Sequence, residues 1–138
     1  MSSALKGIGA LIVALVVWFV VATAVHRLMC ALWPAYALAT PLLNFTLPMK
    51  VARLSLGALS TLIAAAAARR MSAVTWLPLA LGCVLLALFL PEHYRLWNRF
   101  PVWYHLTFLL TIIPAVLVGA LLPALGNKDI NMGNSALR

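Results

Sequence analysis

Acidic residues are nearly absent from this sequence, since Glu92 and Asp129 are the only two in 138 residues. Neither lies inside one of the long apolar stretches of the chain. A carboxylate within a span is the usual coupling group of proton-driven transport. The sequence therefore disfavours a small transporter.

The sequence also lacks a cluster of cysteine and histidine that would indicate a zinc site. Its two cysteines, Cys30 and Cys83, are not a C-x-x-C pair, and we expect them at different membrane depths, so no disulfide is predicted. No Gly/Ser-rich linker, low-complexity run or internal repeat divides the chain. The sequence predicts a single domain.

Apolar residues dominate: 65% of the chain is hydrophobic, 9% is charged, and the mean hydropathy is +1.06. About 20 helical residues cross a hydrocarbon core, and a strand would need a closed barrel, for which the sequence shows no alternation. The predicted class is all-α, an integral membrane bundle of four transmembrane helices in residues 1–125, followed by a flexible polar tail in 126–138. The predicted spans are residues 7–25, 49–68, 71–91 and 101–125.

The segment between the first two spans is apolar but interrupted by Pro34, Pro41 and Pro48. Proline breaks helices, so we place this segment at the membrane interface rather than across the membrane. Thr46 is the expected N-cap of the second helix, with Pro48 in its first turn. The run Ala22-Thr23-Ala24 resembles a signal-peptidase site, but we favour an uncleaved first helix.

The formal charge is +8, but the basic residues occur singly or in pairs beside the apolar stretches. We therefore expect the bilayer and its anionic headgroups as their partners, and no nucleic acid. Four spans place five basic residues on each side, so the positive-inside rule does not decide the orientation. We favour both termini in the cytoplasm and a multi-pass protein of the bacterial inner membrane.

Four-span connectivity places all three histidines on one side of the membrane: His26 ends the first span, His93 lies in the third loop, and His105 opens the fourth span. Helical spacing puts His105 on the face that carries Ala115 and Gly119, whose small side chains allow close helix packing. Arg53 shares a face with small residues of the second helix, so the two residues point to the same end of the bundle. The candidate ligand- or lipid-binding residues are His26, Arg27, Lys50, Arg53, His93, Arg95, Arg99 and His105.

Two interpretations of this polar side stay open. The first is interfacial anchoring, because tryptophan, tyrosine and arginine are typical of the headgroup level. The second is a shallow pocket for an anionic headgroup, a quinone or a haem. His26 and Cys30 would form a pair of metal ligands one turn apart if the first helix continued that far. No cofactor and no metal are predicted, with haem left open.

The function that the sequence favours is a non-enzymatic structural or accessory membrane protein, which packs against itself or against another membrane protein. The chain has no catalytic constellation, since Glu92 and Asp129 are both expected in loops and hydroxyls within spans usually bond to their own helix. The alternative is a membrane module for ligand binding or electron transfer that uses the histidine- and arginine-bearing side.

Overall fold

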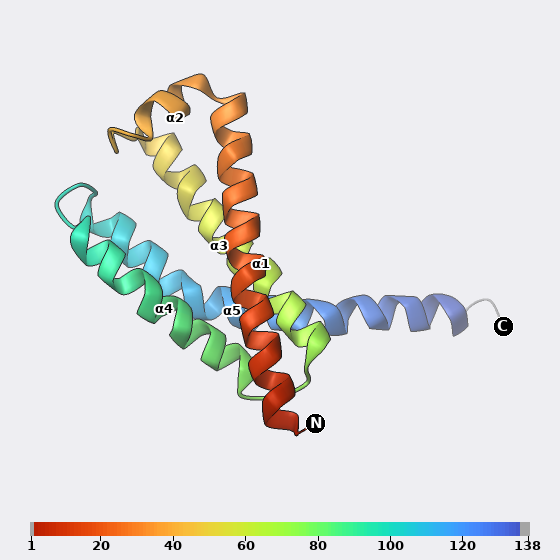
Figure 1. Cartoon of the computed structure of the whole chain (residues 1–138). Helices are drawn as coiled ribbons and strands as arrows, with labels where there is room; N and C mark the ends of the chain where they lie inside the picture. The colour runs from red at the N-terminus through yellow and green to blue at the C-terminus, as the bar shows by residue number, and fades with distance from the viewer. Residues whose placement is uncertain (1, 136–138) are drawn as a thin grey trace.

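The structure is a computed structural model that describes residues 2–135, with side chains to residue 124. It is all-helical over these residues, as predicted, and contains no strand there. Four of its helices are long and apolar enough to cross a membrane. The flexibility predicted for residues 126–138 lies outside the described side chains and stays a prediction. The helices are α1 (Ser3–Leu32), α2 (Pro34–Ala39), α3 (Leu47–Met71), α4 (Leu77–Arg95) and α5 (Val102–Ser135) (Figure 1).

Helix α1 is longer than the predicted span of residues 7–25, because it continues to Leu32. His26 and Arg27 are compatible with a helix, and the first residue that cannot continue one is Pro34, which opens α2. His26 and Cys30 therefore lie one turn apart on α1. The first helix thus continues far enough for the two side chains to contact each other, as the predicted pair of ligands required.

Helix α4 corrects two predictions. It begins at Leu77 rather than at residue 71, because Pro78 is tolerated only in the first turn of a helix. It also continues through Pro91 to Arg95, so His93 lies in the last turn of α4 and not in a loop. A proline so near the C-terminus removes one hydrogen bond, while the turn that follows it buries His93 against α5.

The proline-containing segment between α1 and α3 forms the short helix α2 and a turn. Thr46 is the N-cap of α3 and a proline lies in the first turn, both as predicted, although the threonine side chain makes no capping hydrogen bond. Leu43 has a positive φ of 54° in the turn before it. The prolines thus define the ends of elements in this segment.

Helix α3 lies between α1 and α5, and α4 packs mainly on α5. Helices α3 and α4 are joined by a short connection, but their mutual contact is small beside that of α3 with α5. The small-residue faces explain the observed order: a Cβ on Gly119 of α5 would lie 2.5 Å from the Leu62 carbonyl oxygen of α3, and one on Gly57 would lie 2.7 Å from the Phe108 ring. Helices approach this closely only where a side chain is missing.

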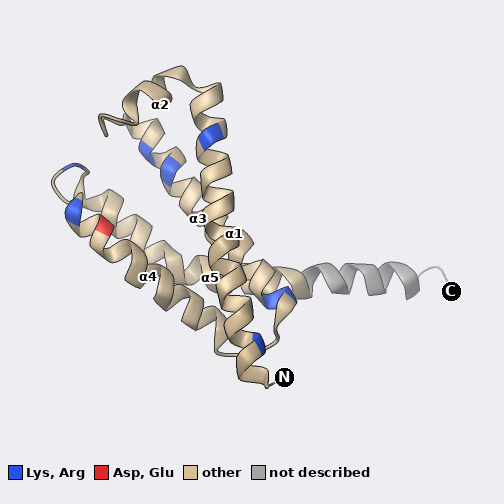
Figure 2. Ribbon diagram, viewed as in Figure 1, with Lys and Arg blue, Asp and Glu red and all other residues tan. Residues whose placement is uncertain are grey.

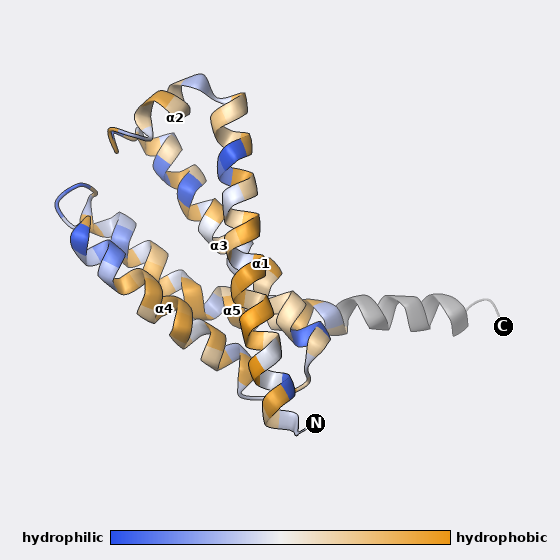
Figure 3. Ribbon diagram, in the orientation of Figure 1, coloured by the Kyte–Doolittle hydropathy of each residue, from blue (hydrophilic) through white to orange (hydrophobic). Residues whose placement is uncertain are grey.

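The α1–α3 pair and the α4–α5 pair diverge toward the end that carries α2 and the α4–α5 connection (Figure 1). Basic residues gather at the two ends of the bundle (Figure 2), and the stretches between them are largely apolar (Figure 3). This is the charge distribution expected of helices that cross a bilayer. The divergent end is the polar side predicted from the sequence, and we call it the histidine end.

Candidate functional site: a cavity at the histidine end

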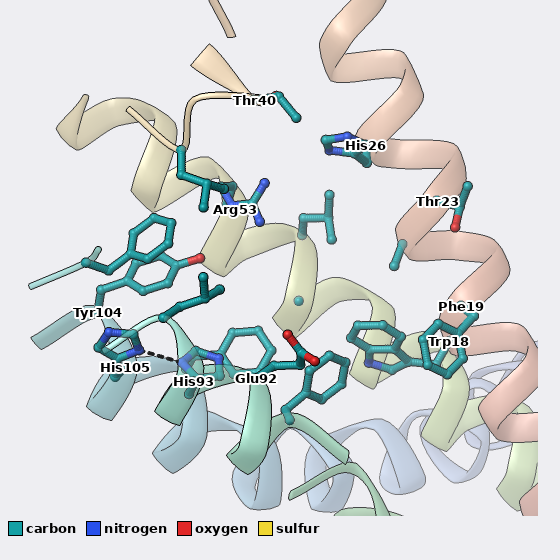
Figure 4. A pocket seen from close by; sticks show the side chains of 18 residues that line it. Trp18, Phe19, Thr23, His26, Thr40, Arg53, Glu92, His93, Tyr104 and His105 are labelled. Carbon is teal, nitrogen blue, oxygen red and sulfur yellow. Dashed lines mark hydrogen bonds between the residues drawn. The ribbon is translucent and has the colours of Figure 1, made fainter. Parts of the chain in front are cut away.

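A cavity of about 490 Å³ lies between the two helix pairs. Its walls come from all four long helices and from the turn after α2 (Figure 4). Pockets that bind small molecules are typically of this size, mostly apolar with a few polar groups. The aromatic lining residues are Trp18, Phe19, Phe89, Phe100, Tyr104 and Phe108, and the polar ones include Thr23, His26, Thr40, Arg53, Glu92, His93 and His105.

Arg53 projects from α3 into this cavity (Figure 4). Its Nη1 donates a hydrogen bond of 3.1 Å to the Tyr36 hydroxyl, and its guanidinium carbon lies 4.6 Å from the centre of the Phe45 ring. Its Nε is buried and has no hydrogen-bond partner. The one carboxylate among the described side chains, Glu92, pairs instead with Arg95 at 2.8 Å. The positive charge of Arg53 is therefore not neutralised by a carboxylate within residues 2–124.

A directed chain of hydrogen bonds extends from Arg53 to α1. The Tyr36 hydroxyl accepts from Arg53, and we assign its own proton to the bond with His26 Nδ1, 3.2 Å away. His26 then carries its proton on Nε2, which lies 3.7 Å from the Cys30 sulfur. In this assignment His26 is a neutral imidazole, and the contacts tie α2 to both α1 and α3.

On the opposite wall, His93 of α4 and His105 of α5 meet with their Nδ1 atoms 2.8 Å apart. His105 is fully buried, and its ring stacks on that of Trp97 with centroids 4.9 Å apart. A hydrogen bond between two ring nitrogens needs one donor and one acceptor. At most one of the two Nδ1 atoms therefore carries a proton.

The remaining ring nitrogen of His105, Nε2, is buried without a partner, and this decides the arrangement of protons. A buried N–H without an acceptor is rarer in proteins than a buried acceptor without a donor. We therefore assign the proton of His105 to Nδ1, where it is donated to His93. His93 then carries its proton on Nε2, and its side chain lines the cavity.

Aromatic rings join the two walls at the histidine end. Phe45, which precedes α3, stacks on Phe100 with centroids 6.0 Å apart, and Phe100 stacks on Tyr104 at 4.8 Å. On the opposite side of the cavity, the Trp18 indole N–H of α1 donates a buried bond of 3.0 Å to the Thr61 hydroxyl of α3. These contacts fix the shape of the cavity.

Four of the eight candidate residues line the cavity, namely His26, Arg53, His93 and His105. The predicted convergence of Arg53 and His105 is found at the level of the cavity, although each bonds a different residue. The other four lie outside the lining: Arg27, Arg95 and Arg99 are exposed, and Lys50 is half-buried.

The predicted site residues do not include Tyr36, Trp18 and Tyr104, which lie in or beside the cavity. Tyr36 lies in the segment that proline made hard to interpret, and only the fold shows that it is fully buried beneath Arg53 and His26. Trp18 looked like one apolar residue among many. Its spacing of one helical turn from Ala14 and Ala22 was the available indication of a packed face, because small residues mark such faces in membrane helices.

Within the part of the chain that the structure describes, no group of three or more His, Cys, Asp and Glu side chains could hold a metal ion. No protein-family model, curated protein or solved structure matches this chain.

Proposed function

We propose that this protein is a non-enzymatic multi-pass membrane protein that binds an amphipathic anion in the cavity at the histidine end. Arg53 holds the anionic group, and the aromatic walls hold the apolar part of the same molecule. We assign it to the inner membrane of a bacterium, with both termini in the cytoplasm.

The observation that supports the proposal is the guanidinium of Arg53 in an apolar cavity without a carboxylate partner among the described side chains. A charge taken out of water is costly unless it is paired. Tyr36 and Phe45 hold the side chain in place but carry no negative charge. A bound anion would supply the missing charge, and the amphiphiles of the membrane itself are the molecules that could bring it there.

Binding is proposed rather than catalysis because of the state of His26. The Cys30 thiol lies 3.7 Å from His26 Nε2, but in the tautomer assigned above this nitrogen presents an N–H to the sulfur and not a lone pair. It cannot take the thiol proton in that state. The cysteine also lies outside the cavity lining.

The accessory role favoured by the sequence needs a helix face that a partner protein covers. The outward faces of the four long helices carry many exposed apolar residues, among them Leu79, Leu110 and Leu121. Lipid contact accounts for such faces as well as a partner does. We therefore base the proposal on the cavity, which lipid contact alone does not require.

Titration of the detergent-solubilised protein with phosphatidylglycerol, followed by native mass spectrometry, tests this proposal. Arg53→Leu should weaken binding about 10- to 100-fold, the equivalent of one charge-assisted hydrogen bond. Arg99→Leu removes the same charge from an exposed position outside the cavity and should bind like the wild type. Equal affinities of the two variants would disprove the assigned site.

A further inference from the structure

We propose that the bound anion is an ester-linked glycerophospholipid, whose phosphate contacts Arg53 and whose ester carbonyl accepts a hydrogen bond from His93. This inference rests on the proposed function and deepens it. It assigns His93 as a second determinant of specificity and His105 as the residue that positions it.

Hydrogen-bond donors lie on two walls of the cavity. Arg53 supplies donors from the α3 side of the cavity, and His93 supplies one from the α4 side. The two lie on opposite walls in Figure 4. Both walls therefore present hydrogen-bond donors. The Glu92 carboxylate, which also lines the cavity, is already paired with Arg95. A matching ligand carries an anion and a separate neutral acceptor.

The amphiphiles of a membrane differ in the hydrogen-bond acceptors that they carry. A free fatty acid has one polar group. Its carboxylate can accept hydrogen bonds from Arg53 or from His93, but it leaves the other donor without an acceptor. A quinone has two acceptor oxygens but no charge to offset that of Arg53. A glycerophospholipid has both, since its phosphate and its ester carbonyls are a few bonds apart.

A haem is disfavoured by the protonation of the histidine pair. Coordination through His93 Nε2 would require the proton on His93 Nδ1, donated to His105. His105 would then carry an N–H on Nε2, which is buried and has no acceptor. The observed packing therefore favours His93 as a hydrogen-bond donor over His93 as a metal ligand.

The position of the cavity along the bundle also fits a phospholipid. Arg53 lies near the start of α3, and His93 and His105 lie on either side of the α4–α5 connection, whereas Trp18 lines the cavity from the middle of α1 (Figure 4). Headgroup and ester groups lie at the edge of a bilayer, and acyl chains lie beneath them. The cationic and histidine side chains of the cavity and the Trp18 side chain follow the same order.

The test compares the affinities of dioleoyl phosphatidylglycerol and of its ether-linked analogue, which keeps the phosphate and lacks the ester carbonyls. The wild type should bind the ester lipid about fivefold more tightly, as expected for one neutral hydrogen bond. His93→Phe should lose this preference, whereas His93→Gln, which keeps an N–H donor, should retain most of it. Tyr94→Phe, at an exposed neighbouring position, should behave like the wild type.

The wild-type measurement tests the inference even if His93→Phe fails to fold. Equal affinities of the ester and ether lipids for the wild type would overturn it, as would an unchanged preference in folded His93→Phe. Equal affinities for oleate and phosphatidylglycerol would likewise overturn it, because a ligand with one anionic group and no separate acceptor would then be sufficient. These results would leave the Arg53 requirement standing, whereas unchanged lipid binding by Arg53→Leu would reject the proposed function itself.

Discussion

His93 and His105 share a single hydrogen-bonding proton between their Nδ1 atoms, 2.8 Å apart, across the interface between α4 and α5. The geometry makes the two histidines chemically different, although both side chains are buried. His105 donates from Nδ1 and keeps a bare Nε2, whereas His93 accepts at Nδ1 and keeps an N–H. If both rings were protonated, two donors would face each other and the contact would break.

Nitrogen-15 NMR of histidine-labelled protein at neutral pH should detect this difference. We expect one ring protonated at Nδ1 and two at Nε2, the latter being His93 and His26. His105→Phe should remove the Nδ1-protonated signal, and His93→Gln should remove one of the others. Three rings with the same tautomer would contradict the assignment of both hydrogen-bond chains.

The fold could be predicted largely from the sequence because the bilayer imposes one strong requirement. Each apolar stretch must satisfy its own backbone, so length and composition identify the helices. The errors occurred at the ends of helices, where this requirement is weak. Helix α1 continued past His26, and α4 continued past Pro91, since local packing rather than hydropathy decides those turns.

The site could be predicted only in part. Connectivity placed the three histidines and Arg53 at one end, and helical spacing correctly turned His105 inward. Which residue bonds which depends on packing between elements far apart in the sequence, as the contact of Tyr36 with Arg53 shows. The spacing of residues on one helix carries no information about the partners on another.

Close packing of α3 and α5 should depend on Gly119. A Cβ at this position would lie 2.5 Å from the Leu62 carbonyl oxygen, and backbone cannot move away as a side chain can. Gly119→Ala should therefore destabilise the protein by about 1–3 kcal/mol. Thermal unfolding in one detergent, followed by circular dichroism, measures this change.

Gly9 supplies the control, because a Cβ there meets nothing within 4 Å. Gly9→Ala should leave the unfolding temperature unchanged or raise it slightly, since alanine is favoured over glycine by about 0.5–1 kcal/mol in a helix. Similar losses of stability in both variants would show that the α3–α5 contact is assigned wrongly.

The buried bond between Trp18 and Thr61 should contribute to the packing of α1 on α3. Thr61→Val keeps the shape of the side chain but leaves the indole N–H without an acceptor, so we expect a loss of roughly 1 kcal/mol in stability. Thr111→Val is the matched control, because the Thr111 hydroxyl is exposed and bonds only carbonyls of its own helix. Equal stabilities of the two variants would argue against the interhelical bond.

The side of the membrane on which the histidine end lies can be determined with the two native cysteines. Cys30 is half-buried near the end of α1, beside His26. Cys83 is exposed on α4, about 9 Å along the helix from Leu77 at 1.5 Å per residue. Its exposed surface faces lipid in a spanning α4, and a charged reagent does not enter hydrocarbon.

A charged, membrane-impermeant maleimide should therefore label Cys30 and leave Cys83 unlabelled, because it reacts with thiols that water reaches. With both termini in the cytoplasm, Cys30→Ser should abolish the labelling of intact bacterial spheroplasts that express the protein, and Cys83→Ser should barely change it. Labelling of Cys30 only after lysis would invert the orientation and place the cavity at the cytoplasmic face. Labelling of Cys83 without Cys30 would contradict the four-span arrangement, because the residue within the apolar part of α4 would then be the one in water.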